Sequence, residues 1–205
     1  STRAAENLAE EIELLGPKRL SEVEEAQAKI VTEIRALEQS GQIMIMRPVF
    51  AAAKATPQRV AYAEGEDERV LRAVQTVVDE KLARPILIGR PEIIATRIAK
   101  AGLRLQAGVD FELCDPEDDP RFRQYWEAYL RLLGRRGVSP EAAKAAVRRS
   151  TTTIAALMVQ LGHADAMLCG LHGRFDVHLD HVRDIIGKAH GVSNFATLNA
   201  LMLEQ

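Results

Sequence analysis

Histidines that follow a short apolar segment are the residues whose types and positions best suit the binding of a ligand or a metal. The apolar segment Ala166–Cys169 ends at Gly170, and His172 and His178 come after it. An apolar run of this length that glycine closes predicts a buried strand. Because parallel sheets bind ligands at the loops that follow their strands, we expect the stretch from Gly170 to His178 to be a ligand-facing loop, with Arg174 available to an anion.

A metal site is the alternative use of these histidines. His178 and His181 have the i, i+3 spacing that places two side chains on one face of a helix, where they could share a metal ion. No cysteine completes a ligand set, and Asp176 and Asp180 are explained equally well as surface residues. We therefore expect no metal.

An acidic stretch, Glu64–Glu68, follows the apolar segment Arg59–Ala63. The dipole of a helix that begins here would stabilise these carboxylates by roughly 0.3–1 kcal/mol each. The same carboxylates would repel the phosphates of an anionic ligand. We therefore interpret the stretch as the start of a helix, and Arg69 just beyond it is a candidate ligand-binding residue.

Other polar and aromatic groups are better explained by structure than by chemistry. The hydroxyl run at 150–153 has no neighbouring His–Asp arrangement to activate it, so it predicts capping hydroxyls at a helix start. The arginine pairs at 135–136 and 148–149 could engage the phosphates of a coenzyme, but cations are favoured near helix ends in any case. Helical spacing favours core packing over base stacking for four aromatic residues: Phe122, Tyr125, Trp126 and Tyr129.

Strand-like and helix-like segments alternate from residue 59 onward, and these elements must position the residues above. Short apolar segments predict strands at 59–63, 85–88, 111–114 and 166–169. Amphipathic or apolar segments predict helices at about 69–81, 93–99, 122–129 and 151–161, and Ser139 with Pro140 marks the start of another helix, with Ser139 as its cap. This alternation predicts an α/β fold, with a mostly parallel sheet and helices on both of its faces. The segment 194–203 fits a strand or a helix equally well.

The first 43 residues have a different pattern. Residues 4–15 have apolar side chains at helical spacing and end at Gly16 and Pro17. Ser21 and Glu24 form a capping box that starts a second amphipathic helix. Two helices this short need a partner surface to cover their apolar stripes.

The composition is that of an ordinary globular protein. Among 205 residues the hydrophobic fraction is 47% and the charged fraction 27%. The formal net charge of -2 gives no electrostatic reason to expect nucleic acid or an anionic membrane as a partner. No apolar run approaches the roughly 20 residues of a membrane span, and the acidic start is unlike a secretory leader. We therefore expect a cytoplasmic protein whose two cysteines, Cys114 and Cys169, are reduced.

Long runs of sequence from residue 46 onward resemble the first half of the phosphotransacetylase-like domain of bacterial NADP-dependent malic enzymes. These runs are RPVF at 47–50, AYAEGEDERV at 61–70, RPILIGR at 84–90, DPEDDP at 115–120, ADAMLCG at 164–170 and NAL at 199–201. The resemblance to this phosphate acetyl/butyryltransferase family implies the parallel α/β fold predicted above. Because the family's domain is longer, we expect the chain to be a truncated form of it.

The resemblance also bears on catalysis. In active members, the serine, arginine and aspartate most closely tied to acetyl transfer lie in the half that we expect to be missing. Two further arginines of active members correspond to Leu133 and Asp180, which cannot neutralise a transferring phosphoryl group. The resemblance therefore implies a non-catalytic domain without a cofactor, which binds acetyl-CoA as a regulatory ligand and helps to assemble oligomers. Phosphate acetyltransferase activity is an alternative.

Residues 1–43 resemble another family, through STRAAE at 1–6, LGP at 15–17 and RLSEVEEAQ at 19–27. These runs are similar to the closing helices of the middle domain of the flagellar motor switch protein FliG. The joining of two unrelated segments implies a chimera or a fragment fusion. A second alternative follows, in which the chain is an interaction protein that self-associates or binds a partner through these helices and the apolar C-terminal segment.

The sequence thus predicts three parts: a helical segment at 1–43, a linker and first helix at 44–58, and a truncated α/β domain at 59–205. It predicts no catalytic residues and no metal ligands. The candidate ligand-binding residues are Arg69, Gly170, His172, Arg174 and His178.

Overall fold

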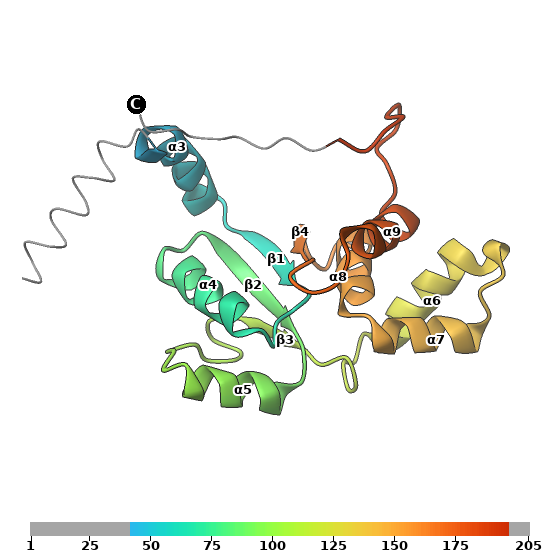
Figure 1. The fold of residues 1–205 in the computed structure, drawn as a ribbon, viewed down its shortest axis with the longest axis horizontal. Coiled ribbons are helices and arrows are strands. Elements are labelled where there is room, and N and C mark those ends of the chain that lie inside the picture. Colours follow the sequence, from blue (N-terminus) through green and yellow to red (C-terminus); the bar gives the residue numbers. More distant parts are fainter. Residues whose placement is uncertain (1–41, 197–205) are drawn as a thin grey trace, which may run out of the picture. The chain divides into compact units, whose positions relative to one another are not determined.

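The structure, a computed structural model, describes residues 42–196 (Figure 1). It has two compact units, which part between Val49 and Phe50, and the second unit contains the sheet. Helix α3 (Gln42–Ala55) crosses this division. The helices predicted at 4–15 and from Ser21 lie outside the described residues, and the predicted division into three parts stays a prediction.

Four parallel strands form one sheet in the order β3-β2-β1-β4. Their bounds are β1 (Gln58–Tyr62), β2 (Ala83–Ile88), β3 (Glu112–Cys114) and β4 (Ala166–Leu168). In register, Val60 of β1 lies opposite Pro85 on one side and Ala166 on the other. The predicted parallel sheet is confirmed.

Helices cover both faces of this sheet (Figure 1). One face carries α4 (Glu68–Asp79) and α5 (Pro91–Lys100). The other carries α6 (Phe122–Leu133), the 3-10 turn η1 (Gly134–Arg136), α7 (Pro140–Arg149), α8 (Thr151–Gln160) and α9 (Phe175–Ile185). The α/β fold with helices on both faces is confirmed.

The alternation of side chains along each strand creates two separate cores. Tyr62 and Leu87 point to the α4–α5 face and pack with Leu71, Val74 and Ile94. Their neighbours along the strands point to the opposite core, whose members include Ala61, Ile88, Cys114, Tyr125 and Leu157. Burial on both faces is why these strands are continuously apolar.

Helix α8 is the most deeply buried helix of the described part. Every residue from Thr152 to Met158 is buried. Ser150 caps its start, where the Ser150 side chain accepts a hydrogen bond from the Thr153 backbone N–H at 3.1 Å. The predicted role of the hydroxyl run as a helix start is confirmed, and so is the Ser139 cap of α7.

The strand at 166–168 differs from its prediction as a buried strand. Within the described residues β4 pairs only with β1, so it lies at an edge of the sheet. Leu168 is 55% exposed, and Ala166 is exposed as well. An apolar run indicates that a strand is suited to burial. Whether the strand is buried depends on which strands and helices pack against it in the fold.

Two smaller features complete the fold. Both cysteines are free, with Cys114 buried and Cys169 half-buried. Burial raises the pKa of the Cys114 thiol far above its usual range, so this thiol stays protonated. No helix among residues 42–196 is long and apolar enough to cross a membrane.

Candidate functional site

A crevice is expected where the direction of the chain across the sheet reverses. The chain runs outward from β1 to β2 and β3 with α4 and α5 on one face, then returns to the other side of β1 at β4. The helices of the return connection cover the opposite face, so the chain leaves the neighbouring strands β1 and β4 toward helices on opposite faces of the sheet. Open α/β sheets bind ligands at such a switch point.

Asp67 is the polar centre of this region. Its side chain caps α4 by accepting the backbone N–H of Arg69 at 2.8 Å, and it also receives the Arg69 guanidinium at 3.1 Å. The other carboxylate oxygen lies 2.8 Å from Nε2 of His172, in the loop after β4. The bonds from Arg69 and then His172 hold the pKa of Asp67 well below its usual range, against the opposing effect of burial.

Glu64 joins the two loops at a second point. Its carboxylate accepts a hydrogen bond from the backbone N–H of Gly170 at 2.8 Å. Gly170 has a φ of 99°, a left-handed conformation that favours glycine. Glu64 and Asp67 thus connect the loop after β1 to the loop after β4, although 106 residues separate Glu64 from Gly170.

His178 supports the loop from behind. Its Nε2 donates to the backbone carbonyl of His172 at 2.6 Å, so its Nδ1 is free to accept the Thr152 hydroxyl at 3.0 Å. A Cβ added at Gly173 would lie 3.2 Å from His178 Nε2, so the loop passes close over this ring. His178 is therefore a positioning residue for the loop.

His178 also corrects a prediction. It belongs to α9, which begins at Phe175, and not to a loop that extends from residue 170 to 178. Its helical neighbour His181 lies 3.2 Å from Thr153 Oγ1, and burial together with His178 lowers the pKa of His181. No group of three or more metal-binding side chains occurs within the described range.

Two hollows lie on either side of Glu64. The first has a volume of about 350 Å³ and is mostly apolar, with Arg69 and Gly170 at its border. Its other lining residues include Tyr62, Val70, Ala73, Leu168, Cys169 and Leu171. The second has a volume of about 320 Å³ and contains Arg90 and Arg148 together with Glu66 and Glu117.

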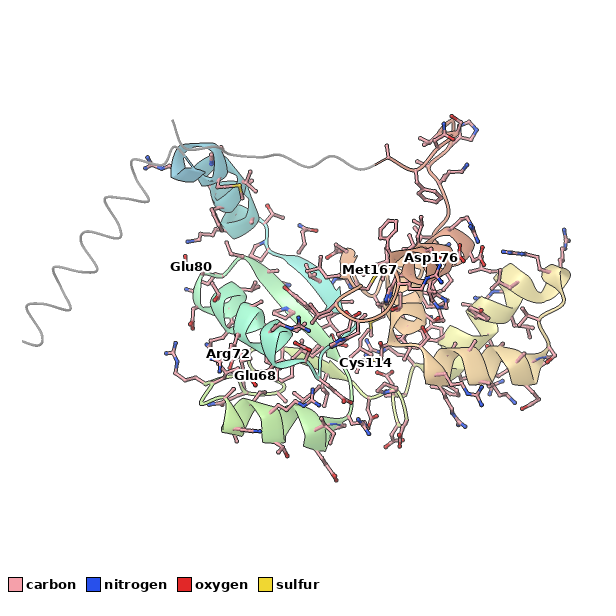
Figure 2. All side chains as sticks on the ribbon, in the orientation of Figure 1. Glu68, Arg72, Glu80, Cys114, Met167 and Asp176 are labelled. Carbon is pink, nitrogen blue, oxygen red and sulfur yellow. The ribbon has the colours of Figure 1, made fainter. Side chains whose placement is uncertain are left out.

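The structure brings four of the five sequence-predicted site residues into one region. Arg69 and Gly170 line the first hollow, His172 shares Asp67 with Arg69, and His178 holds the backbone of His172. Arg174 differs, because its guanidinium pairs with Asp176 at 2.6 and 3.0 Å. Figure 2 shows Asp176 on α9.

Sequence reasoning missed two residues that organise this region, Asp67 and Thr152. Both lie within stretches that the sequence predicted as helix starts: Asp67 caps α4, and Thr152 lies in the first turn of α8. Their second contacts are made across the fold: Asp67 contacts His172, 105 residues later in the chain, and Thr152 contacts His178, 26 residues later. For Asp67, a capping residue with a spare carboxylate oxygen was the available signal.

Leu133 and Asp180, which correspond to arginines of active family members, are not cationic. Leu133 is buried and Asp180 is paired with an arginine. Leu133 is only 5% exposed, in the last turn of α6. Asp180 forms an ion pair with Arg183 at 2.8 Å along α9.

The fold defines a class: an open, parallel α/β domain, in which the carboxyl ends of the strands are the usual place for a ligand. The family model described as "Phosphate acetyl/butaryl transferase" matches residues 44–205. The chain therefore belongs to the phosphate acetyl/butyryltransferase family.

Several curated relatives of this chain are malic enzymes. It is 55% identical to the NAD-dependent malic enzyme of Rhizobium meliloti over 162 residues, which are 78% of this chain and 21% of that protein. It is 49% identical to the NADP-dependent malic enzyme of Haemophilus influenzae, with the same shares of each chain. A phosphate acetyltransferase of Nitratidesulfovibrio vulgaris is 33% identical over 58% of this chain and 16% of its own length. The chain thus spans about a fifth of the length of these malic enzymes.

Solved phosphotransacetylases share the fold. That of Streptococcus pyogenes has a TM-score of 0.65 and 24% identity, and the similarity covers 73% of this chain and 45% of that one. The EutD phosphotransacetylase of Staphylococcus aureus has a TM-score of 0.64 and 20% identity over the same shares. At these identities the likeness shows the fold alone.

The N-terminal segment matches a different family. Residues 1–45 match the model described as "FliG C-terminal domain". The predicted resemblance to FliG is confirmed. The matching model is described as the C-terminal domain, whereas the sequence runs indicated the middle domain.

Proposed function

We propose that this chain is a ligand-binding domain of the malic-enzyme type, which binds acetyl-CoA at the crevice between β1 and β4 as a regulatory ligand. It contributes to oligomer assembly and does not itself transfer the acetyl group. The identity of 55% to a malic enzyme over 162 residues is the observation that carries this proposal. A cytoplasmic location stays a prediction.

The chemistry of the first hollow supports the choice of ligand. An acyl-CoA combines an apolar acyl and thioester end with a polyanionic nucleotide end. The apolar lining of the hollow suits the first, and the exposed Arg69 guanidinium at its border suits a phosphate. Because Arg69 already pairs with Asp67, a phosphate must compete with a carboxylate, and we expect weak binding, with a Kd of roughly 1 mM.

The absence of transfer activity is supported by two positions. Stabilisation of a transferring acyl or phosphoryl group needs preorganised cations or N–H donors. The family's arginine positions hold Leu133, which is buried, and Asp180, which is anionic and paired with Arg183. We expect the purified chain to release no CoA from acetyl-CoA in the presence of phosphate, and release at a catalytic rate would favour the acetyltransferase alternative.

Calorimetric titration with acetyl-CoA tests the proposal. Arg69→Ala should weaken binding by about fivefold, since an exposed charge contact contributes roughly 1 kcal/mol. Arg72→Ala is the matched control, because Arg72 lies on the same helix (Figure 2), is exposed, pairs with Glu68 at 2.7 Å, and is not among the residues that line the hollow. No heat and no thermal shift at millimolar acetyl-CoA would rule out the proposal.

The match of residues 1–45 to a FliG model favours a second candidate function, an interaction module. In this case the N-terminal segment supplies protein–protein contacts, either with a second copy of this chain or with another protein. The two functions are compatible, because they use different segments of the chain.

A further inference from the structure

A third hollow lies at the end of the sheet opposite to the candidate site. It has a volume of about 620 Å³ and is lined by residues at the amino ends of β1, β2 and β3 and at the carboxyl end of α4. Small-molecule sites have volumes of about 300–1,000 Å³. Its floor is apolar, because Ile86 and Phe111 line it and both are buried residues of the hydrophobic cores.

The charges around this hollow favour a single negative charge on a ligand. Three cations and two carboxylates line it, a net charge of +1. Arg59 is held by Asp165 at 2.8 Å, and Glu112 is held by Arg121 at 2.6 Å.

The remaining charged residues are Asp110, Lys81 and Arg84. Asp110 accepts the backbone N–H of Gln106 at 2.8 Å. Lys81 and Arg84 have no carboxylate within ion-pair distance in the part of the chain that the structure describes. Two available cations on the border of an apolar floor suit one carboxylate, and they are too few for a polyphosphate.

Lys81 has an unusual backbone conformation at this border. Its φ of 55° makes it the only non-glycine residue with a positive φ within residues 42–196. It occupies the left-handed position after α4, where the Lys81 N–H donates to Val78 O at 3.1 Å and the Leu82 N–H donates to Val77 O at 2.9 Å. Glycine is the usual residue at such a position. A strained lysine in place of glycine points to a role for its side chain.

Val109 provides a second unusual feature. Its side chain is 77% exposed at the border of the hollow. Backbone hydrogen bonds hold its loop closed, from Gly108 N–H to Phe111 O and from Asp110 N–H to Gln106 O, both at 2.9 Å. A ligand with an apolar tail would cover this side chain and remove it from water.

We propose that this hollow binds a small monocarboxylate with an apolar tail. The carboxylate lies between Lys81 and Arg84, and the tail lies over Phe111 and against Val109. This site is separate from the acetyl-CoA crevice, which is at the carboxyl ends of the strands.

Titration of the full chain with octanoate, monitored by calorimetry, tests the proposal. We expect octanoate to bind at least tenfold more tightly than octanol, which has the same tail without the charge. Lys81→Gln and Arg84→Gln should each weaken octanoate binding by about tenfold, because each removes a charge-assisted hydrogen bond. Lys100→Gln should leave binding unchanged, because this exposed lysine at the end of α5 does not line the hollow.

Lys81→Gly separates binding from folding. Glycine relieves the left-handed strain, so this variant should melt at the native temperature or above it and still lose octanoate binding. Equal binding of octanol and octanoate, or native affinity in the Lys81 and Arg84 variants, would overturn the proposal.

A competition experiment distinguishes this site from the acetyl-CoA crevice. Acetyl-CoA should not displace octanoate. If acetyl-CoA does not bind to the chain at all, octanoate should still bind with the same affinity, so the failure of one proposal leaves the other standing. Displacement of octanoate by acetyl-CoA would place both ligands in one site and would contradict this inference alone.

Discussion

Gly65 lies where the loop after β1 passes the backbone of β2. Its N–H donates to Ile88 O at 3.1 Å. A Cβ built on Gly65 would lie 2.8 Å from Ile88 O and 2.9 Å from Ile88 N. Neither atom can move without disturbing β2, so the close approach of loop and strand requires glycine for reasons of space.

Gly65→Ala should therefore lower the free energy of unfolding by about 1–3 kcal/mol, the usual cost of overpacking. Gly134→Ala is the matched control. Its φ of -57° suits alanine, and the nearest atom to an added Cβ is Leu130 Cδ1 at 3.7 Å. We expect this variant to be about 0.4–1 kcal/mol more stable than the native chain in urea unfolding. Native stability in Gly65→Ala would show that the loop after β1 can move away from β2.

The pairing of β1 with β4 is reinforced at the element scale by Arg59 and Asp165. The Arg59 backbone N–H and guanidinium both donate to the Asp165 carboxylate, and the Asp165 backbone N–H donates to Arg59 O at 2.8 Å. These bonds fix the start of an edge strand that has few contacts of its own. The Arg59 side chain, followed by the Arg59 backbone N–H, lowers the pKa of Asp165 to about 2.

This lowered pKa predicts part of the acid sensitivity of the fold. A carboxylate with a depressed pKa in the folded state stabilises the protein above its unfolded pKa of about 3.9, and this contribution disappears as the pH falls toward 2. Asp165→Asn should therefore show a smaller loss of thermal stability between pH 4 and pH 2 than the native chain, as measured by circular dichroism.

A residual loss will remain in this variant, because the pKa values of Glu66, Asp67 and Asp184 are also lowered by their arginine partners. Asp118→Asn, an exposed position in the turn after β3, is the control and should keep the native pH profile. If Asp165→Asn also kept the native profile, the pair with Arg59 would not contribute to stability.

Helix α8 explains why α9 can hold the loop after β4. Within the buried stretch of α8 from Thr152 to Met158, the hydroxyls of Thr152 and Thr153 contact His178 and His181 on α9. Each hydroxyl would otherwise be a buried polar group without a partner. The position of α9, and therefore of the loop that His178 supports, is thus set by a helix of the core.

At the scale of the whole molecule, the two family matches divide the chain near residue 45. Among the residues that the structure describes, the members of both hydrophobic cores lie between Val60 and Ile186. Removal of residues 1–43 should therefore change the melting temperature of the α/β part by no more than a few degrees.

The same deletion tests the interaction function. If the FliG-like segment mediates self-association, light scattering should give a lower mass for the deleted chain than for the full chain at equal concentration. An unchanged mass would remove the main support for this function. It would leave the acetyl-CoA proposal untouched, because the residues of that crevice lie outside the deleted segment.

The sequence by itself determined the elements, their order and their class. The strands near 59–63 and 85–88 and the helices that follow them were predictable, because burial on two faces of a sheet or on one face of a helix leaves a local periodic pattern. Capping residues such as Ser139 and Ser150 marked helix starts by their chemistry. The long runs shared with malic enzymes identified the family before any geometry was known.

Only the tertiary structure decided which strands are neighbours and which residues meet. Placement of β4 beside β1 brings Gly170 to Glu64 and His172 to Asp67, and it leaves Leu168 exposed at an edge. No local pattern encodes these contacts, because they join segments more than 100 residues apart. They form only when both faces of the sheet are packed, so the crevice is a property of the assembled core.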